Sequence, residues 1–331
     1  MVQEEWPSVL PVPGKEYPRS FKLISGLIVP SVAVISKVWL TWFNRTRIDH
    51  AEVFVKAIDD HQRDHSYPLV TMCNHHSCLD DPGLWGALFP WSRIWSASRH
   101  RWAAAAQDIC YTKRIHSLFF SFGKTFPIIR GGGIHQRGVQ YALDLMKQNE
   151  FLHFFPQGKV VHDDEDSVSE TGELSLRDCE FEKTYELKWG LARLILEYLD
   201  LPMESSGPAT TTAAKSISRT GIGNPGTSGE TGDGGDNDCR KILLLPFYHI
   251  GMKNALPNSA PYIPKVFKNI YISIRESGPI QIDHKYLLKH CFNGDASLPL
   301  EEKRRLIMKR LEEELKIMKL KAIKFRDSCE F

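Results

Sequence analysis

The chain has 331 residues, 42% of them hydrophobic, and a formal net charge of +2 at pH 7. This length suffices for one large domain or two, and the small net charge excludes an overall electrostatic field that would attract nucleic acid. The 7 cysteines are an odd number without compact spacing, which argues against a disulfide framework. Glu4, Glu5 and Glu16 are incompatible with a signal peptide or an acid-poor transit peptide, so we expect any membrane address to lie inside the mature chain.

A proline-rich start is followed by the most apolar long stretch of the chain, residues 21–43. This stretch is long enough to cross a bilayer, but Pro30 interrupts it and Lys37 lies within it. Trp39 and Trp42 stand near one end, where interfacial anchors occur. The pattern favours a kinked or re-entrant segment in one leaflet over a full span and over a buried soluble helix.

A strand-to-helix turn is predicted within residues 68–82, which read PLVTMCNHHSCLDDP. The segment opens as a buried strand and restarts as a helix at Pro82, with Asp81 as the capping carboxylate. His75 and Asp80 lie between these elements. Five positions along one helix would place them roughly 140° apart, whereas in such a turn they can meet. A second register of the same spacing would join His76 to Asp81, and the capping role of Asp81 argues for the first.

A histidine held by a carboxylate is a general base near neutral pH, because the carboxylate fixes the tautomer and stabilises the imidazolium. The sequence contains no G-x-S-x-G nucleophile elbow, so this base would act on a hydroxyl of the substrate. Two other interpretations remain open, a purely structural pair and a metal site. The metal ligands would be Cys73, His75, His76 and Cys78, but the second ligand pair of a structural zinc site is not evident in the sequence.

Predicted helices and strands alternate along the rest of the chain, which is typical of an α/β domain. Helices are expected over residues 49–62, 82–89, 102–109, 139–147, 185–199 and 300–325, and strands over residues 92–97, 126–130, 151–155, 242–247 and 269–275. The aromatic run 118–122 is either a core segment or one wall of an acyl groove, and core is favoured. Ligands of α/β sheets bind at strand ends, which directs attention to the residues there.

Three strand ends carry candidate binding residues. Arg130 precedes three glycines, a combination suited to a phosphate because glycines let backbone N–H groups approach an anion, although a plain flexible turn would look the same. The strand 151–155 runs into Pro156-Gln157-Gly158-Lys159. His249 follows the strand 242–247, where a structural histidine and a lipid contact are equally compatible with the pattern.

Five segments together resemble one protein family. Residues 74–80, NHHSCLD, resemble the H-x4-D motif of the glycerolipid acyltransferases. Four further segments resemble the tafazzin family within that group, in the same order along the chain. They are DDPGLWG at 80–86, DICYTK at 108–113, KWG at 188–190 and HIGM at 249–252. The H-x4-D spacing alone is weak, whereas the ordered series is specific.

The resemblance implies a mixed central sheet flanked by helices and a phospholipid–lysophospholipid transacylase activity. His75 would take the proton from a lysophospholipid hydroxyl, and Asp80 would orient His75. The family's binding residues carry over to Arg130, Gln157, Gly158, Lys159 and Pro246, of which Arg130 and Lys159 would hold lipid phosphates and Pro246 would lie near the acyl donor. Most members carry an acidic residue where this chain has Gln157, which keeps an acceptor but loses a charge.

The resemblance also implies partners and a compartment. The partners are phospholipid, lysophospholipid and a membrane surface, with no nucleic acid, and neither cofactor nor metal is needed because one ester replaces another. The family implies cardiolipin remodelling on the inner and outer mitochondrial membranes that face the intermembrane space. Two alternatives stay open: an acyl-CoA-dependent lysophospholipid acyltransferase, and a non-catalytic lipid-binding homologue, which the residue at position 157 motivates.

The expected organisation is an irregular and membrane-interfacial segment over residues 1–45, followed by an acyltransferase domain over 46–331. Residues 203–238 are almost entirely Ser, Thr, Gly, Ala and Asp and are predicted to be a disordered insertion. Residues 161–178 are acidic and polar and are predicted to form a mobile loop.

Overall fold

The computed structural model describes residues 6–160, 187–202, 240–257 and 263–329. In these residues an eight-stranded sheet has the order β1-β7-β6-β2-β5-β3-β4, and β8 pairs with β6. The strands are β1 (Arg45–Asp49), β2 (Leu69–Met72), β3 (Trp102–Ala106), β4 (Thr125–Ile128), β5 (Phe151–Phe154), β6 (Ile242–Ile250), β7 (Asn269–Ile274) and β8 (Ile280–Ile282). Pairing is antiparallel where β6 meets β7 and β8 and parallel elsewhere, so the expected mixed sheet is confirmed.

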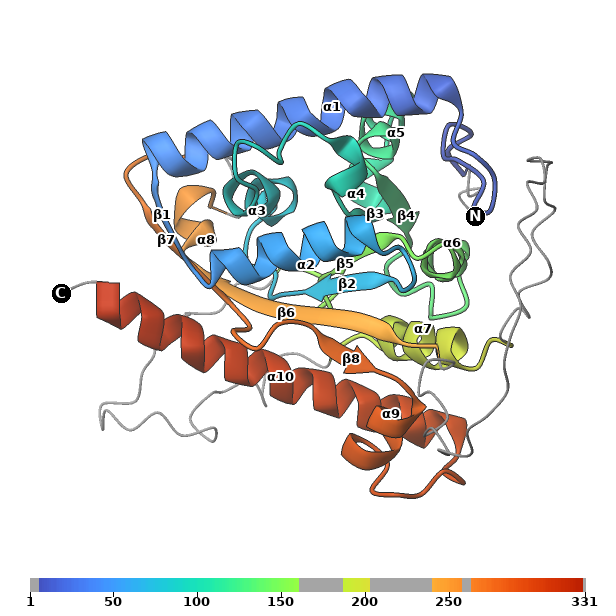
Figure 1. The fold of residues 1–331 in the computed structure, drawn as a ribbon. Helices are drawn as coiled ribbons and strands as arrows, with labels where there is room; N and C mark the ends of the chain where they lie inside the picture. The colour runs from blue at the N-terminus through green and yellow to red at the C-terminus, as the bar shows by residue number, and fades with distance from the viewer. Residues whose placement is uncertain (1–5, 161–186, 203–239, 258–262, 330–331) are drawn as a thin grey trace, which may run out of the picture.

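Helices cover both faces of the sheet (Figure 1). They are α1 (Arg19–Val38), α2 (Ala51–Arg63), α3 (Asp80–Leu88), α4 (Gln107–Cys110), α5 (Arg114–Phe122), α6 (Arg137–Lys147), α7 (Gly190–Leu199), α8 (Met252–Ala255), α9 (His284–His290) and α10 (Leu300–Cys329). One core lies between the sheet and α6, α7 and α10, and the other lies between the sheet and α2 and α3. Figure 1 shows α1 and α10 along opposite sides of the molecule.

The two cores follow from the two-residue period of strands. In β2, Val70 and Met72 face the first core, whereas Leu69 faces the second. In β6, Leu244 and Tyr248 face the first core, while the odd-numbered residues face α3. This alternation directs His249 toward the helix that carries the H-x4-D aspartate.

The structure corrects three element predictions. Residues 92–97 form turns rather than a strand, with the amides of Arg93 and Ile94 donating to Pro90 O. The predicted helix 102–109 is instead β3 followed by the short α4, because burial between β4 and β5 overrides the helix propensity of its four alanines. The predicted core run 118–122 belongs to α5, in which only Ser121 is buried.

The predicted interruption at Pro30 is also wrong, because α1 continues through this residue into a π-helical turn, Trp39–Phe43. One helical stretch among the described residues, Arg19–Phe43, is long and apolar enough to cross a membrane by length and composition. Its inner face packs against α3 so closely that a Cβ at Gly86 would lie 2.6 Å from Ala33 O. Its outer face exposes Leu23, Leu27 and Ile35, each about 70% accessible.

The buried Lys37 has polar partners inside the protein. Its Nζ atom is buried and donates to the carbonyl oxygens of Gly86, Ala87 and Phe89, at 3.2, 3.4 and 2.7 Å. These carbonyls belong to the carboxyl-terminal end of α3, where a cation is favoured. The loop 161–178, the insertion 203–238 and the predicted helix start at Tyr185 lie outside the described residues.

Candidate active site

The H-x4-D turn lies at the carboxyl end of β2, the strand between β5 and β6. His75 Nδ1 lies 3.0 Å from Asp80 Oδ2. The same oxygen accepts the backbone N–H groups of His76 and Ser77, at 2.6 and 2.8 Å. The turn thus wraps around one carboxylate oxygen, and the side chain of Asp80 has no exposed surface.

The buried carboxylate of Asp80 is held in its charged form. Burial alone would raise its pKa, but the neighbouring rings of His249 and His75 outweigh this and hold the pKa well below its usual value. Because an ionised carboxylate only accepts hydrogen bonds, Nδ1 of His75 carries the proton in this pair. The other ring nitrogen, Nε2, is then the one available to take a proton.

His75 is also fixed from its face and its backbone. Its ring stacks on Phe155 with centroids 4.1 Å apart and an interplanar angle of 20°. Gln157 Oε1 accepts the His75 backbone N–H at 2.6 Å, and the Gln157 side chain is buried. The Gln157 oxygen therefore supports the turn, and this takes the place of the expected role as acceptor for a glycerol hydroxyl. Gly158, at φ +69°, and Lys159 follow it on the surface.

The second register, His76 with Asp81, does not form. Asp81 Oδ1 accepts from Trp85 Nε1 at 3.0 Å and pairs with the buried Arg101. The His76 ring instead meets Asn74 Nδ2 at 3.0 Å. The prediction that Asp81 caps the helix is therefore wrong, since no side chain caps α3.

Arg130 lies on a structured turn and not on a flexible one. Gln136 braces this turn: its Oε1 accepts from Ile129 N at 2.7 Å, and its Nε2 donates to Ile129 O and Gly133 O. Arg130 pairs with Asp108 of α4 at 3.1 Å, and both side chains are about half exposed. Burial and the charge of Asp80 raise the pKa of the Cys78 thiol, and the charge of Arg130 partly offsets this.

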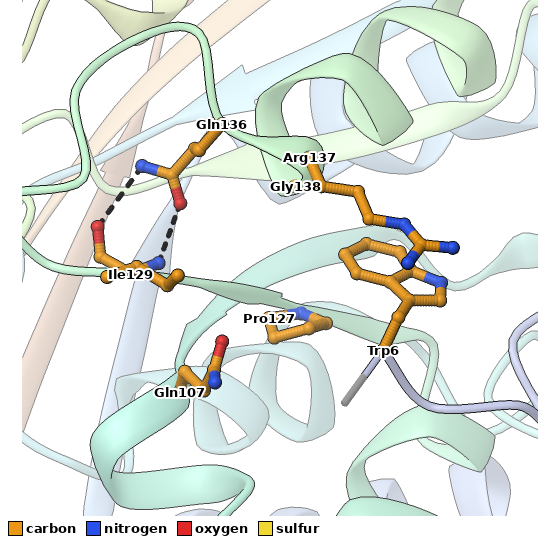
Figure 2. A pocket seen from close by; sticks show the side chains of 7 residues that line it. All are labelled: Trp6, Gln107, Pro127, Ile129, Gln136, Arg137 and Gly138. Atoms are coloured by element: carbon orange, nitrogen blue, oxygen red, sulfur yellow. Dashed lines mark hydrogen bonds between the residues drawn. The ribbon is translucent and has the colours of Figure 1, made fainter. Parts of the chain in front are cut away.

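A small pocket, partly open to solvent, adjoins the braced turn (Figure 2). Gln107, Ile129 and Gln136 line it, together with Arg137, whose guanidinium lies 4.6 Å from the ring centre of Trp6. None of the predicted site residues lines this pocket. It is therefore a neighbour of the site and not the site itself.

Pro246 and His249 lie on β6 beside the turn. Pro246 is buried in the sheet in register with Met72 of β2, so it lies beneath the turn and not on the surface. His249 is fully buried against Asn74 and Asp80, which excludes a direct lipid contact. In the part of the chain that the structure describes, no group of three or more His, Cys, Asp or Glu side chains is arranged to hold a metal ion.

Comparison with known proteins places this geometry in a family. A family model described as Acyltransferase matches residues 52–206. The chain is 31% identical over 252 residues to tafazzin of Drosophila melanogaster, 30% over 247 residues to taffazin of Dictyostelium discoideum, and 35% over 168 residues to N-acylphosphatidylethanolamine synthase of Arabidopsis thaliana. The alignments cover 76%, 74% and 51% of this chain, and 50%, 66% and 52% of those relatives.

The chain therefore belongs to the acyltransferase family. Within that family it belongs with the tafazzins, which confirms the resemblance found in the sequence. It spans between half and two thirds of the length of the relatives it matches.

Proposed function

We propose that the protein is a phospholipid–lysophospholipid transacylase with His75 as the general base and Asp80 as the residue that orients it. The observation that carries this proposal is the 3.0 Å pair between His75 Nδ1 and Asp80 Oδ2. It forms where an α/β sheet places its ligands, and it leaves Nε2 for the reaction.

The reaction is an exchange of esters. Nε2 of His75 takes the proton of the lysophospholipid hydroxyl while the oxygen attacks the ester carbonyl of the donor phospholipid. The new ester bond forms, the donor's C–O bond breaks, and the imidazolium returns its proton to the leaving oxygen. The Asp80 carboxylate stabilises the imidazolium between these two steps. Because bonds of the same kind form and break, the exchange needs neither an energy source nor a cofactor.

The predicted binding residues take roles compatible with their positions. Arg130 and Lys159 hold lipid phosphates, and a phosphate competes with Asp108 for the Arg130 guanidinium. Gln157 fixes the backbone of His75 beside Gly158. Pro246 supports the turn from the neighbouring strand, close to the acyl donor.

The protein binds a lipid surface as a monotopic protein, with the outer face of α1 in one leaflet. The exposed Leu23, Leu27 and Ile35 support this placement, and Trp42 and Phe43 extend the apolar face beyond α1. The inner face of α1 is already packed against α3, which argues against a span surrounded by lipid. Following the tafazzins, we assign the reaction to cardiolipin remodelling on mitochondrial membranes that face the intermembrane space.

The test is acyl transfer by purified protein from a labelled phospholipid to a lysophospholipid in mixed vesicles, with and without CoA. Transfer without CoA that is lost in His75→Ala supports the proposal. Transfer only from acyl-CoA would identify the CoA-dependent acyltransferase, and the absence of transfer from either donor would identify a non-catalytic lipid-binding protein.

A second candidate differs only in the acyl acceptor. The relative from Arabidopsis thaliana is named an N-acylphosphatidylethanolamine synthase, and its matched segment is 35% identical to this chain. A base placed like His75 can deprotonate an attacking amine as well as a hydroxyl. The same assay with phosphatidylethanolamine as the sole acceptor separates the two, since an amide product survives mild alkali that cleaves esters.

A further inference from the structure

We propose that His249 is a positioning residue for the transfer, whose ring N–H holds the Asp80 carboxylate and the H-x4-D turn in their reactive geometry. This inference rests on the proposed function for its kinetic consequence. The geometry itself is independent of that function.

His249 joins β6 to the turn through its backbone. The ladder between β2 and β6 ends at the pair of Met72 and Pro246. Beyond it, the Asn74 side chain takes the place of a strand, because Nδ2 donates to His249 O and Oδ1 accepts from His249 N, both at 2.9 Å. These two hydrogen bonds fix the position of β6 relative to the turn.

The ring of His249 makes a second connection. Its Nε2 lies 3.0 Å from Asn74 O and 3.4 Å from Asp80 Oδ2. Both oxygens are acceptors, so Nε2 carries a proton. Nδ1 is buried without a hydrogen-bond partner among the described residues. The contacts of the ring with both oxygens therefore run through Nε2.

Asp80 Oδ2 thus lies at the convergence of four N–H groups. Three come from the turn itself and bond the oxygen, namely His75 Nδ1 and the amides of His76 and Ser77. The fourth, His249 Nε2 of β6, bonds Asn74 O and lies 3.4 Å from Asp80 Oδ2. Asp80 Oδ1 is buried and has no partner among the described residues. All these contacts of the carboxylate are therefore with one oxygen, and His249 supplies the contact from outside the turn. Without it, the carboxylate loses the side-chain contact that comes from β6, while Gln157 and Phe155 still hold the backbone and ring of His75.

The experiment compares His249→Gln with His249→Asn. Both side chains are amides, but only glutamine is long enough to place an N–H near the position of Nε2. We expect His249→Asn to lower kcat by about 10- to 100-fold with little change in KM, and His249→Gln to recover most of the rate. Equal rates for wild type and both variants, at equal melting temperature, would overturn the proposal.

A second measurement does not depend on acyl transfer. In protein labelled with ¹⁵N at histidine, the Nδ1–H resonance of His75 reports its bond to Asp80, and Asp80→Asn identifies the signal. We expect this resonance to shift in His249→Asn and to return in His249→Gln. An unchanged resonance in His249→Asn would overturn the proposal even if the variants lose activity. Absence of transacylation by the wild-type protein would refute the proposed function. The positioning role of His249 would then be judged from the His75 Nδ1–H resonance alone.

Discussion

Two neighbouring aspartates illustrate how packing separates chemically identical side chains. Asp80 is wrapped by backbone N–H groups and meets His75, whereas Asp81 meets Arg101 and Trp85. The family motif at residues 74–80 and the capping role assigned to Asp81 both paired His75 with Asp80, and only the second of these grounds is wrong. It assigned the backbone N–H groups to Asp81, while in the structure Asp80 receives them and still binds the imidazole. One carboxylate oxygen accepts several donors, which the capping argument did not consider.

We predict that His75→Ala lowers the acyl-transfer rate by about 10²- to 10⁴-fold, because it removes the general base. The melting temperature should change little, since the ring is partly exposed and stacks on one side only. His76→Ala is the comparison, because its ring Nδ1 meets Asn74 Nδ2, whereas Nδ1 of His75 meets Asp80. Rates and melting curves of both variants check this. A dead His76→Ala beside an active His75→Ala would show that the wrong histidine was chosen.

Gln157→Glu should change the rate only modestly, because the oxygen that accepts the His75 amide is present in both side chains. The added charge lies beside the His75–Asp80 pair and should strengthen the base slightly. The assay is kcat and KM for wild type and variant at several pH values. A gain of 100-fold or more would mean that the native glutamine impairs the enzyme.

The helices and strands that could be predicted were those whose hydrophobic residues recur with a clear helical or strand period. The helices at 49–62, 82–89, 139–147 and 300–325 and the strands at 126–130, 151–155, 242–247 and 269–275 are confirmed to within a few residues. Strand β1 was not predicted because its residues RTRID are mostly polar, which is typical of a strand at the edge of a sheet. The pairing of Arg101 with Asp81 was missed because the two residues are 20 positions apart, and no local pattern marks such a pair.

Helix α3 ends against a buried histidine that makes stability depend on pH. His100 packs on Phe89 and meets Ile94 O at 3.0 Å, and burial lowers its pKa to about 4. Between about pH 6.5 and 4 the unfolded chain binds a proton that the folded chain does not, so stability falls as pH falls. From pH 7.5 to 5 this histidine should cost about 2 kcal/mol of unfolding free energy.

The check is His100→Gln, which can still donate to Ile94 O but does not titrate. We expect its melting temperature to fall less than that of wild type between pH 7.5 and 5. A residual slope should remain, because burial also lowers the pKa of His61, His76 and His153. Parallel slopes for wild type and variant would contradict the assignment.

At the scale of the whole molecule, the two sides of the 203–238 insertion meet. Arg240 donates from Nε to Leu201 O at 3.2 Å and from Nη2 to Pro202 O at 2.9 Å. We predict that replacing residues 205–236 by a short Gly/Ser linker leaves activity within a few-fold, because the removed composition offers little to bury and the ends are already adjacent. Circular dichroism and the transfer assay test this. An unfolded deletion variant would show that the segment belongs to the fold.

The outer face of α1 predicts how the molecule meets lipid. Leu27→Glu combined with Ile35→Glu should weaken sedimentation with vesicles by at least about 10-fold, since each buried leucine contributes about 1.5–3 kcal/mol, while the melting temperature stays unchanged. Leu300→Glu, also exposed but on α10 at the opposite side, is the control. Unchanged vesicle binding by the double variant would place the contact elsewhere. Protection of opposite chain ends on opposite sides of a sealed vesicle would show a span.

The contact between Lys37 and the end of α3 also bears on how far the site lies from the apolar face of α1. Asp80 begins α3, and the carbonyls that Lys37 binds lie at its other end, 9 residues along the helix. The backbone at Asp81 is not helical, so only residues 82–88 form a continuous helical spacer, about 10 Å long. This spacer packs directly against α1, the helix whose outer face is apolar and exposed. With α1 in one leaflet as proposed, this packing would hold His75 at a fixed distance from the lipid surface, and we expect a preference for ester groups at that depth.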